Sequence, residues 1–275
     1  MFLAKVDADM QNVEIVRVLP GAAPFNQRNF NDTFVGQFLL KSKRTRHGYI
    51  KDVNKQQLVN EILASLLGRD LGLPIPDSYL GFVKSGDLSV SKIPMSDGSG
   101  HVVFVSADVG VPSLVQRYLP HGDFYKLMLV NELKKWVHLG ATYAFDTWIA
   151  NTDRHEGNLL IEDATKIWLI DHGHAFTGHQ WTEADLVPLA KYRNRLSEWL
   201  TAYLTGDFKV AKGKEAEACA AKLGAVPFDE YLQSISGMKI LSKNESQAII
   251  DFLASRVSVV SQYSKEALGV PSLVA

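Results

Sequence analysis

Cysteine is almost absent from this chain of 275 residues, because Cys219 is the single one. One cysteine cannot form an internal disulfide or supply a CxxC metal or redox site. Long apolar runs are also missing, so we expect no membrane-spanning helix. The first ten residues contain acidic side chains where a secretory signal needs an unbroken apolar run. We therefore expect a cytoplasmic protein without membrane insertion.

The chain also lacks an excess of charge of either sign. It has 29 Lys and Arg against 30 Asp and Glu, a formal net charge of −1. Proteins that bind nucleic acid usually present a strongly basic surface, so we expect no direct nucleic-acid binding. The apolar fraction of 46% supplies enough side chains for a buried core and excludes intrinsic disorder.

The first hundred residues contain short runs of β-branched and aromatic residues between Gly, Pro, Asn and Asp clusters. This pattern predicts strands at 13–19, 33–40, 47–53, 78–83 and 101–109. One helix interrupts them over 55–71, where apolar residues recur at helical spacing. Gly72 follows at the position of a left-handed cap, and Pro74 prevents continuation of the helix.

Beyond about residue 113 the apolar spacing becomes helical. It predicts helices at 123–137, 141–150, 183–204 and 228–236, an exposed helix at 211–222, and two short strands between 158 and 171. Ser242 and Glu245 form a capping box that opens a last helix of about twenty residues. The sequence therefore predicts an α+β, bilobal protein with a strand-rich N-lobe over 1–112 and a helical C-lobe over 113–275. Ligands favour the cleft between two such lobes.

Polar residues are densest in NTDRHEGN (151–158) and DHGH (171–174). So many polar groups are hard to explain as core, because unpaired buried charges are costly. Asp153 and Asn158 are five residues apart, and a hairpin between Asn158 and Asp171 would bring those two together. One carboxylate and one amide oxygen suit Mg²⁺, while a second carboxylate could orient an acceptor hydroxyl. The D-x-x-x-x-N spacing and the Asp that ends a strand match elements of protein kinases.

These segments resemble a known family. NTDRHEGNLLI and IWLIDHG resemble the catalytic core shared by HipA-like kinases and phosphatidylinositol 3- and 4-kinases, which use D-R-H-x-x-N. Upstream, GYIKDVNKQQLVNEILASLLGRDLGLPIPD resembles the strand and helix of HipA-like kinases, with the shorter bacterial members as the nearest match. The chain departs from kinase patterns in two ways: it has no G-x-G-x-x-G, and His172 replaces the Phe of D-F-G.

The resemblance implies a bilobal kinase that transfers the γ-phosphate of ATP, with Mg²⁺, to a hydroxyl acceptor, expected to be Ser or Thr of a protein. It also implies a role for each matching residue. Lys51 contacts phosphates and pairs with Glu61, Asp153 and His155 are catalytic, Asn158 and Asp171 hold Mg²⁺, and Ala107 and Val109 lie in the hinge that binds adenine. A regulatory protein partner is a further expectation from this resemblance.

Three other functions stay open. A pseudokinase would bind nucleotide without transferring phosphate. A lipid or small-molecule kinase would share the D-R-H loop, although neither a basic amphipathic helix nor an apolar anchor is evident. A metal-dependent hydrolase could use His155, Asp171, His172 and His174 to bind Zn²⁺ or Mn²⁺.

Overall fold

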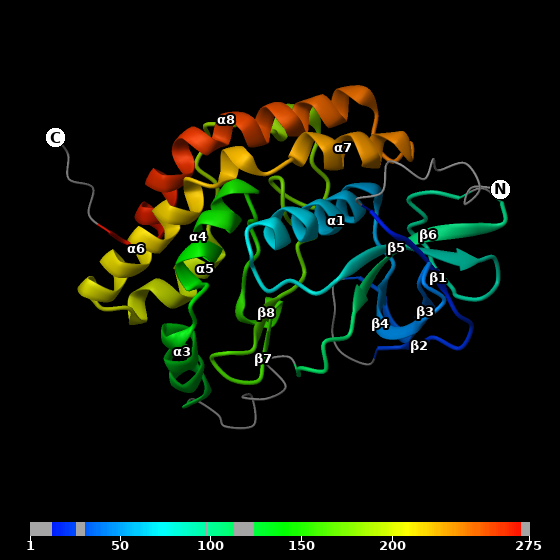
Figure 1. Cartoon of the computed structure of the whole chain (residues 1–275), viewed down its shortest axis with the longest axis horizontal. Coiled ribbons are helices and arrows are strands. Elements are labelled where there is room, and N and C mark those ends of the chain that lie inside the picture. The colour runs from blue at the N-terminus through cyan, green and yellow to red at the C-terminus, as the bar shows by residue number, and fades with distance from the viewer. Residues whose placement is uncertain (1–12, 26–30, 97, 113–123, 271–275) are drawn as a thin grey trace.

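The computed structural model describes residues 13–25, 31–96, 98–112 and 124–270. Strands between residues 15 and 107 form one sheet, and helices make up most of the described remainder (Figure 1). The acidic N-terminal residues and Asp123, the expected start of a helix, lie outside the described residues. The result is a mixed α+β fold.

The large sheet contains six strands. They are β1 (Ile15–Val18), β2 (Ala23–Pro24), β3 (Thr33–Leu39), β4 (Thr45–Lys51), β5 (Ser78–Lys84) and β6 (Gly100–Ala107), in the spatial order β1-β5-β6-β4-β3-β2. The five longer strands fall on the segments predicted from the sequence. Strand β1 pairs in parallel with β5 and antiparallel with β3, so these five strands close into a small barrel.

Side chains alternate between the inside and the outside of this barrel, as the pleat of a strand requires. Ile50 and Val103 point inward, into a core that also contains Val16, Val18, Phe38, Tyr79, Val83, Val105 and Ala107. Their neighbours Lys51 and Phe104 therefore point outward, and they are directly opposite each other in the β4–β6 pairing. The alternation thus aims a lysine away from the barrel core and toward the rest of the protein.

Helix α1 (Lys55–Asp70) follows β4 and covers the outer face of the sheet. The Asn54 side chain accepts a hydrogen bond from the backbone N–H of Gln57, and the Gln57 side chain accepts one from the backbone N–H of Asn54. This reciprocal cap starts the helix. Gly72, with φ of 74°, lies in the left-handed region just beyond its end, as predicted. Helix α1 contacts β5 and β6 on one side and α7 on the other (Figure 1).

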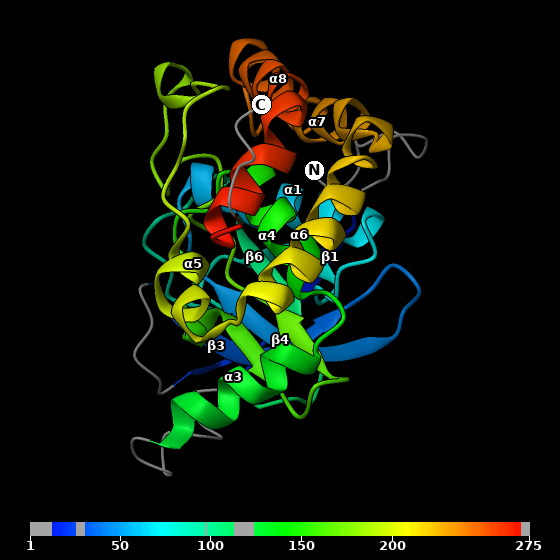
Figure 2. The same cartoon turned by 90° about the vertical axis from the view of Figure 1, so that its left-hand side faces the viewer.

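The remaining helices enclose the largest core of the protein. They are α3 (Tyr125–Lys135), α4 (Leu139–Trp148), α5 (Arg195–Leu200), α6 (Gly206–Ala220), α7 (Phe228–Gly237) and α8 (Lys243–Ala267). A short hairpin of β7 (Leu159–Ile161) and β8 (Ile167–Leu169) follows α4, after the 3₁₀ turn η3 (Glu156–Asn158). Helix α4 packs against both α6 and α8 (Figure 2). The predicted capping box of α8 is present, because the Ser242 hydroxyl accepts the N–H of Glu245.

The prediction of one continuous helix over 183–204 is wrong, because only Arg195–Leu200 is α-helical. The chain forms the 3₁₀ turn η4 (Glu183–Asp185), then α5, then the 3₁₀ turn η5 (Thr201–Tyr203), and residues 186–194 are not helical. Pro188 cannot donate a helical hydrogen bond. Instead the Pro188 and Ala190 carbonyls accept hydrogen bonds from the buried Arg256 of α8, so a tertiary contact fixes this segment.

The helix predicted as exposed over 211–222 is present as α6, but one side of it is buried. Ala216 and Cys219 face the core beside α4 and α8. The small side chains at these positions permit close packing. The Lys and Glu residues between them make the sequence resemble that of an exposed helix, so this buried side could not be recognised from the sequence. Burial raises the pKa of the Cys219 thiol to about 11, so this cysteine stays a neutral thiol.

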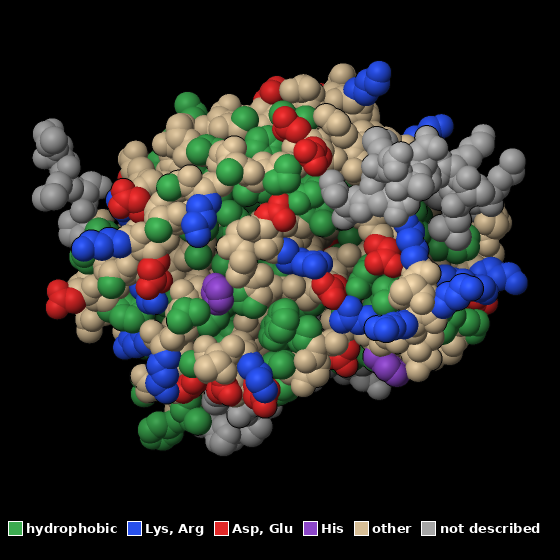
Figure 3. Space-filling model, in the orientation of Figure 1, with side chains coloured by type: hydrophobic (Ala, Val, Ile, Leu, Met, Phe, Trp, Pro, Cys, Tyr) green, Lys and Arg blue, Asp and Glu red, His purple; other side chains and the backbone are tan. Residues whose placement is uncertain are grey.

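Charges of both signs are mixed over the face shown in Figure 3. Within the described ranges, no helix is both long and apolar enough to cross a membrane.

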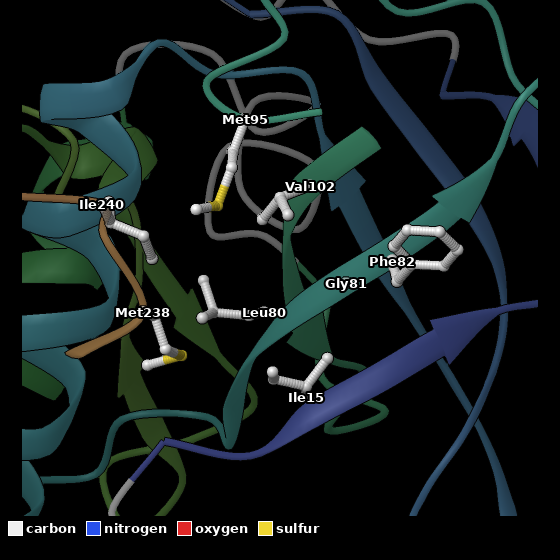
Figure 4. A pocket seen from close by; sticks show the side chains of 8 residues that line it. All are labelled: Ile15, Leu80, Gly81, Phe82, Met95, Val102, Met238 and Ile240. Atoms are coloured by element: carbon white, nitrogen blue, oxygen red, sulfur yellow. The ribbon is translucent and has the colours of Figure 1, made fainter. Parts of the chain in front are cut away.

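A small apolar pocket between Leu80, Met95 and Met238 (Figure 4) has a volume of about 10 Å³. That is room for about one water-sized probe, so it serves as a packing contact and not as a ligand site.

Asn60 connects helix α1 to the segment after β8. Its side-chain N–H₂ group donates to the carbonyls of Gly173, Ala175 and Gly178, and its side-chain oxygen accepts from the Trp181 indole. The side chain is fully buried. A single amide therefore satisfies several polar groups that have no access to water.

We predict that Asn60→Ala lowers the free energy of unfolding by about 3 kcal/mol, because it leaves buried carbonyls without a donor. Ser65→Ala, in the same helix, is the matched control. The buried Ser65 hydroxyl has a single long hydrogen bond of 3.4 Å, so its loss should cost about 1 kcal/mol or less. Urea unfolding followed by circular dichroism measures both values. Equal losses in the two variants would contradict this role of Asn60.

Candidate active site

A cavity of about 510 Å³ lies between the sheet, helix α1 and the polar segments after α4 and β8. All of the site residues predicted from the sequence line it except Val109: they are Lys51, Glu61, Ala107, Asp153, His155, Asn158 and Asp171. Its volume lies within the usual range for small-molecule sites. The structure therefore brings together residues more than a hundred positions apart in the sequence.

Lys51 is the central cation of this cavity. Its ammonium nitrogen lies 2.8 Å from Glu61 Oε1 and 3.2 Å from Asp171 Oδ1. It also lies 5.6 Å from the centre of the Phe104 ring. The other oxygen of Glu61 accepts the backbone N–H of His172 at 2.9 Å. Strand β4, helix α1 and the turn after β8 thus meet in one cluster of charges.

The pKa values follow from this cluster. Burial alone lowers the pKa of Lys51, but the carboxylates of Asp171 and Glu61 outweigh burial and raise it above its usual value. Desolvation alone raises the pKa of Asp171, but the Lys51 ammonium prevails and lowers it to about 2. Burial raises the pKa of Glu61 despite the attraction of Lys51. Lys51 and Asp171 are therefore both charged at neutral pH.

The polar loop is held in place by a buried ion pair. Arg154 is fully buried, and its guanidinium contacts both carboxylate oxygens of Asp146 at 3.0 and 3.1 Å. The same guanidinium donates to the backbone carbonyls of Asn158 and Ile170. The Arg154 side chain therefore holds the backbone at Asn158 and at Ile170, the residue before Asp171. Arg154 is therefore an ion-pairing, structural residue.

Asp153 and Asn158 are joined across the loop. The Asn158 amide nitrogen donates to the backbone carbonyl of Asp153 at 2.7 Å, which leaves the Asn158 amide oxygen available for a cation. The Asn158 carbonyl accepts the backbone N–H of Ile170, so Asn158 lies beside the end of β8. The Asp153 carboxylate is part of the cavity wall and also pairs with Arg195 of α5.

His155 supports the loop through one ring nitrogen. Its Nδ1 accepts the backbone N–H of Gly157 at 2.9 Å, and its Nε2 lies 3.8 Å from Asp153 Oδ2. Burial lowers the pKa of His155, so the ring is neutral at neutral pH and carries its proton on Nε2. Gly157 permits this contact, because a Cβ atom there would come within 2.6 Å of the ring. In this state His155 can donate toward Asp153 and cannot accept a proton at Nδ1.

His172 contributes a buried ring to the cavity wall and does not belong to a metal centre. Its ring is buried and meets the Phe145 ring edge-on at 6.0 Å. Burial lowers its pKa well below the usual value, and the nearby Arg154 lowers it further. Throughout the described parts of the chain, no group of three or more His, Cys, Asp and Glu is placed to hold a metal ion. The zinc centre of the hydrolase hypothesis is therefore not formed.

The oxygen atoms of Asn158 and Asp171 fit a magnesium ion whose coordination sphere is completed by phosphate oxygens and water. Asn158 and Asp171 supply oxygen atoms from adjacent points of the backbone, and Mg²⁺ commonly takes one or two protein ligands with phosphate and water in the other positions. Lys51 balances only one of the two carboxylates that it contacts. The cluster therefore has an excess negative charge that a divalent cation would compensate.

Several cavity residues were not predicted from the sequence. Phe25, Asn31 and Thr33 line the cavity from either side of the β2–β3 connection, and Tyr49 lies two residues before Lys51 on β4. Strand alternation could have found Tyr49, because it shares a face with Lys51. No glycine motif marks the β2–β3 connection, so the sequence contained no signal for it.

Of the two residues expected in the hinge, Ala107 lines the cavity. Its backbone N–H donates to the Asp77 carbonyl and is therefore already used.

Comparisons with known proteins agree with this geometry. The chain is similar to a solved kinase from Helicobacter pylori, the proinflammatory kinase CtkA, with 12% sequence identity and a TM-score of 0.54. The similarity covers 91% of this chain and 97% of that one, and at this identity it shows a shared fold. No curated protein matches the chain. The family model of HipA-like kinases matches residues 28–194, which is more than half of the sequence. The chain belongs to the HipA-like kinase family.

Proposed function

We propose that this protein transfers the γ-phosphoryl group of ATP, bound with Mg²⁺, to the hydroxyl group of a serine or threonine in a protein. The observation that carries the proposal is the position of Lys51. It contacts Glu61 and Asp171 at one wall of the cavity, while Asp153 and Asn158 line the same cavity from the loop before β7. A cation, two oxygen ligands for a metal and a separate carboxylate are the parts that phosphoryl transfer requires.

In this proposal Lys51 binds the phosphates and Glu61 keeps it in place. A lysine ammonium makes charge-assisted hydrogen bonds to phosphate oxygens, which are stronger than bonds between neutral groups. Glu61 remains paired with Lys51 because its other oxygen is held by the His172 N–H. Asn158 and Asp171 would hold the Mg²⁺, which neutralises charge on the phosphates when it is bound.

Asp153 acts on the acceptor. Its carboxylate accepts the proton of the acceptor hydroxyl while the acceptor oxygen forms a bond to the γ-phosphorus and the bond from that phosphorus to the β,γ-bridging oxygen breaks. ADP leaves with the electron pair of that bond. The neutral His155 carries its proton on Nε2, and this nitrogen lies 3.8 Å from Asp153 Oδ2, on the side of the carboxylate that would meet the acceptor.

The two-lobed division belongs to the same proposal. We place the N-lobe at residues 1–112 and the C-lobe at 113–275, with the nucleotide between them. One observation supports this division. The cavity takes its walls from β3–β6 and α1 on one side and from residues 153–174 on the other. We place adenine beside Ala107, which lines the cavity and whose N–H is already used by the Asp77 carbonyl. Val109, which was expected to share this role, does not line the cavity.

Lys51→Met should weaken the binding of Mg·ATP at least tenfold, because it removes the cation that contacts the phosphates. Isothermal titration calorimetry measures the affinity. Lys135→Met is the matched control, since Lys135 on α3 is mostly exposed and pairs only with Glu132 among the described residues. Equal ATP affinity in a folded Lys51→Met variant would remove Lys51 from the nucleotide site.

Asp153→Ala should separate binding from transfer. ATP affinity should change by no more than about twofold, whereas the rate of transfer should fall by about a hundredfold or more, as for the loss of a positioned base. The assay follows γ-labelled ATP in a cell lysate. Acid hydrolysis then tests for phosphoserine and phosphothreonine, and solvent extraction tests for labelled lipid.

Three results would change the proposal. Loss of both binding and transfer would make Asp153 structural. Label recovered in lipid or in small molecules would assign a different acceptor class. Wild-type protein that binds Mg·ATP and labels no acceptor would be a pseudokinase.

A further inference from the structure

One charged contact in the site has no role in the mechanism described above. A terminal guanidinium nitrogen of Arg195 donates to Oδ1 of Asp153, the carboxylate proposed to accept the hydroxyl proton. Arg195 is the first residue of α5, immediately beyond the region matched by the family model. Asp153 lines the cavity and Arg195 does not. The arginine therefore contacts the carboxylate without forming part of the cavity wall.

The stability of helix α5 does not require this contact. Asn194 caps the helix through the N–H of Ser197, and the Trp199 indole donates to the Arg154 carbonyl. Leu196 and Leu200 are buried beneath it. A cation in the first turn of a helix is also at the end that the helix dipole disfavours. The location of Arg195 is therefore better explained by its partner than by its own helix.

The ion pair also contributes little to overall stability. The Arg195 side chain is 39% exposed and that of Asp153 is 26% exposed. Ion pairs between partly exposed side chains usually stabilise the folded state only weakly, because solvent screens them. Their geometric effect is larger, since a donor on one carboxylate oxygen restricts the rotation of the whole group. Here the donor engages Oδ1, and Oδ2 is the oxygen nearest to His155 Nε2.

We propose that Arg195 is a positioning residue that orients the Asp153 carboxylate, so that Oδ2 faces the acceptor hydroxyl. The proposal rests on the proposed kinase function. Arg195 acts through Asp153. It holds Oδ1 from outside the cavity wall, so that Oδ2, the oxygen that accepts the proton, faces the cavity. It compensates the charge of Asp153 near the phosphates without occupying the acceptor position.

The test compares Arg195→Gln, Arg195→Lys and the matched control Arg193→Gln. Arg193 lies two residues before Arg195, just outside α5, and it forms its two hydrogen bonds with Glu198. Two assays at saturating Mg·ATP measure the rate of phosphoryl transfer. One is single-turnover transfer to the acceptor, and the other is ATP hydrolysis, in which water replaces the acceptor. Arg195→Gln should lower that rate about tenfold or more, because misplacing a reacting group is costly. The KM for ATP should stay unchanged.

The other variants separate orientation from folding. Arg195→Lys should recover most of the lost rate, because it restores a cationic donor, and Arg193→Gln should match the wild type. In an Asp153→Asn background, Arg195→Gln should cause no further loss, since both changes act on the same carboxylate. Full additivity of the two losses would overturn the proposal. A wild-type rate in Arg195→Gln would do the same.

A crystal structure of Arg195→Gln completes the test without depending on activity. We expect the Asp153 side chain to leave its present rotamer while α5 stays docked through Trp199. If the wild type transfers no phosphate, the kinase proposal fails, and the Asp153 orientation still decides the role of Arg195. An Asp153 side chain unmoved in the variant would show that Arg195 does not position it.

Discussion

The contact of one ammonium group with two carboxylates is the constraint on which the rest of the site depends. Lys51 ends strand β4, Glu61 lies within α1, and Asp171 follows β8, so the cluster joins three segments that are distant in the sequence. Glu61 is almost completely buried, and an unpaired carboxylate there would carry a large desolvation penalty. The three segments are therefore stable together only in an arrangement that brings their charges into contact.

Buried polar groups around this cluster fix the backbone that carries it. Arg154 ties Asp146 to the carbonyls on both sides of the β7–β8 hairpin, and Asn60 holds the segment that begins at Gly173. Asp171 itself adopts a left-handed backbone with φ of 58°, a conformation that aspartate tolerates better than most residues. Backbone in such sparsely populated regions persists when its surroundings over-determine it. The fully bonded Arg154 and Asn60 provide those surroundings.

Much of this arrangement could be predicted from the sequence, because its local signals are strong. Strand β4 follows from a run of β-branched and aromatic residues, and helix α1 follows from helical periodicity. The spacing of Asp153, Asn158 and Asp171 predicted that they would share one site. Tertiary contacts left no comparable signal. Arg256 binds two carbonyls of the segment after residue 185, and this contact holds the segment in a non-helical conformation where a helix was expected. The α6 face that contains Cys219 is buried by helices distant in the sequence, which a local pattern cannot reveal. The pairing of Arg195 with Asp153 likewise spans 42 positions and no motif marks it.

A crystal structure of the protein with MgCl₂ and a non-hydrolysable ATP analogue tests the central claim most directly. We predict a metal ion bound by the Asn158 amide oxygen and the Asp171 carboxylate. We also predict that Lys51 leaves Asp171 for the phosphates while it keeps its contact with Glu61. The 510 Å³ cavity should contain the nucleotide, with adenine beside Ala107. A nucleotide bound elsewhere, or a Lys51–Asp171 ion pair that persists with the phosphates bound, would contradict the account.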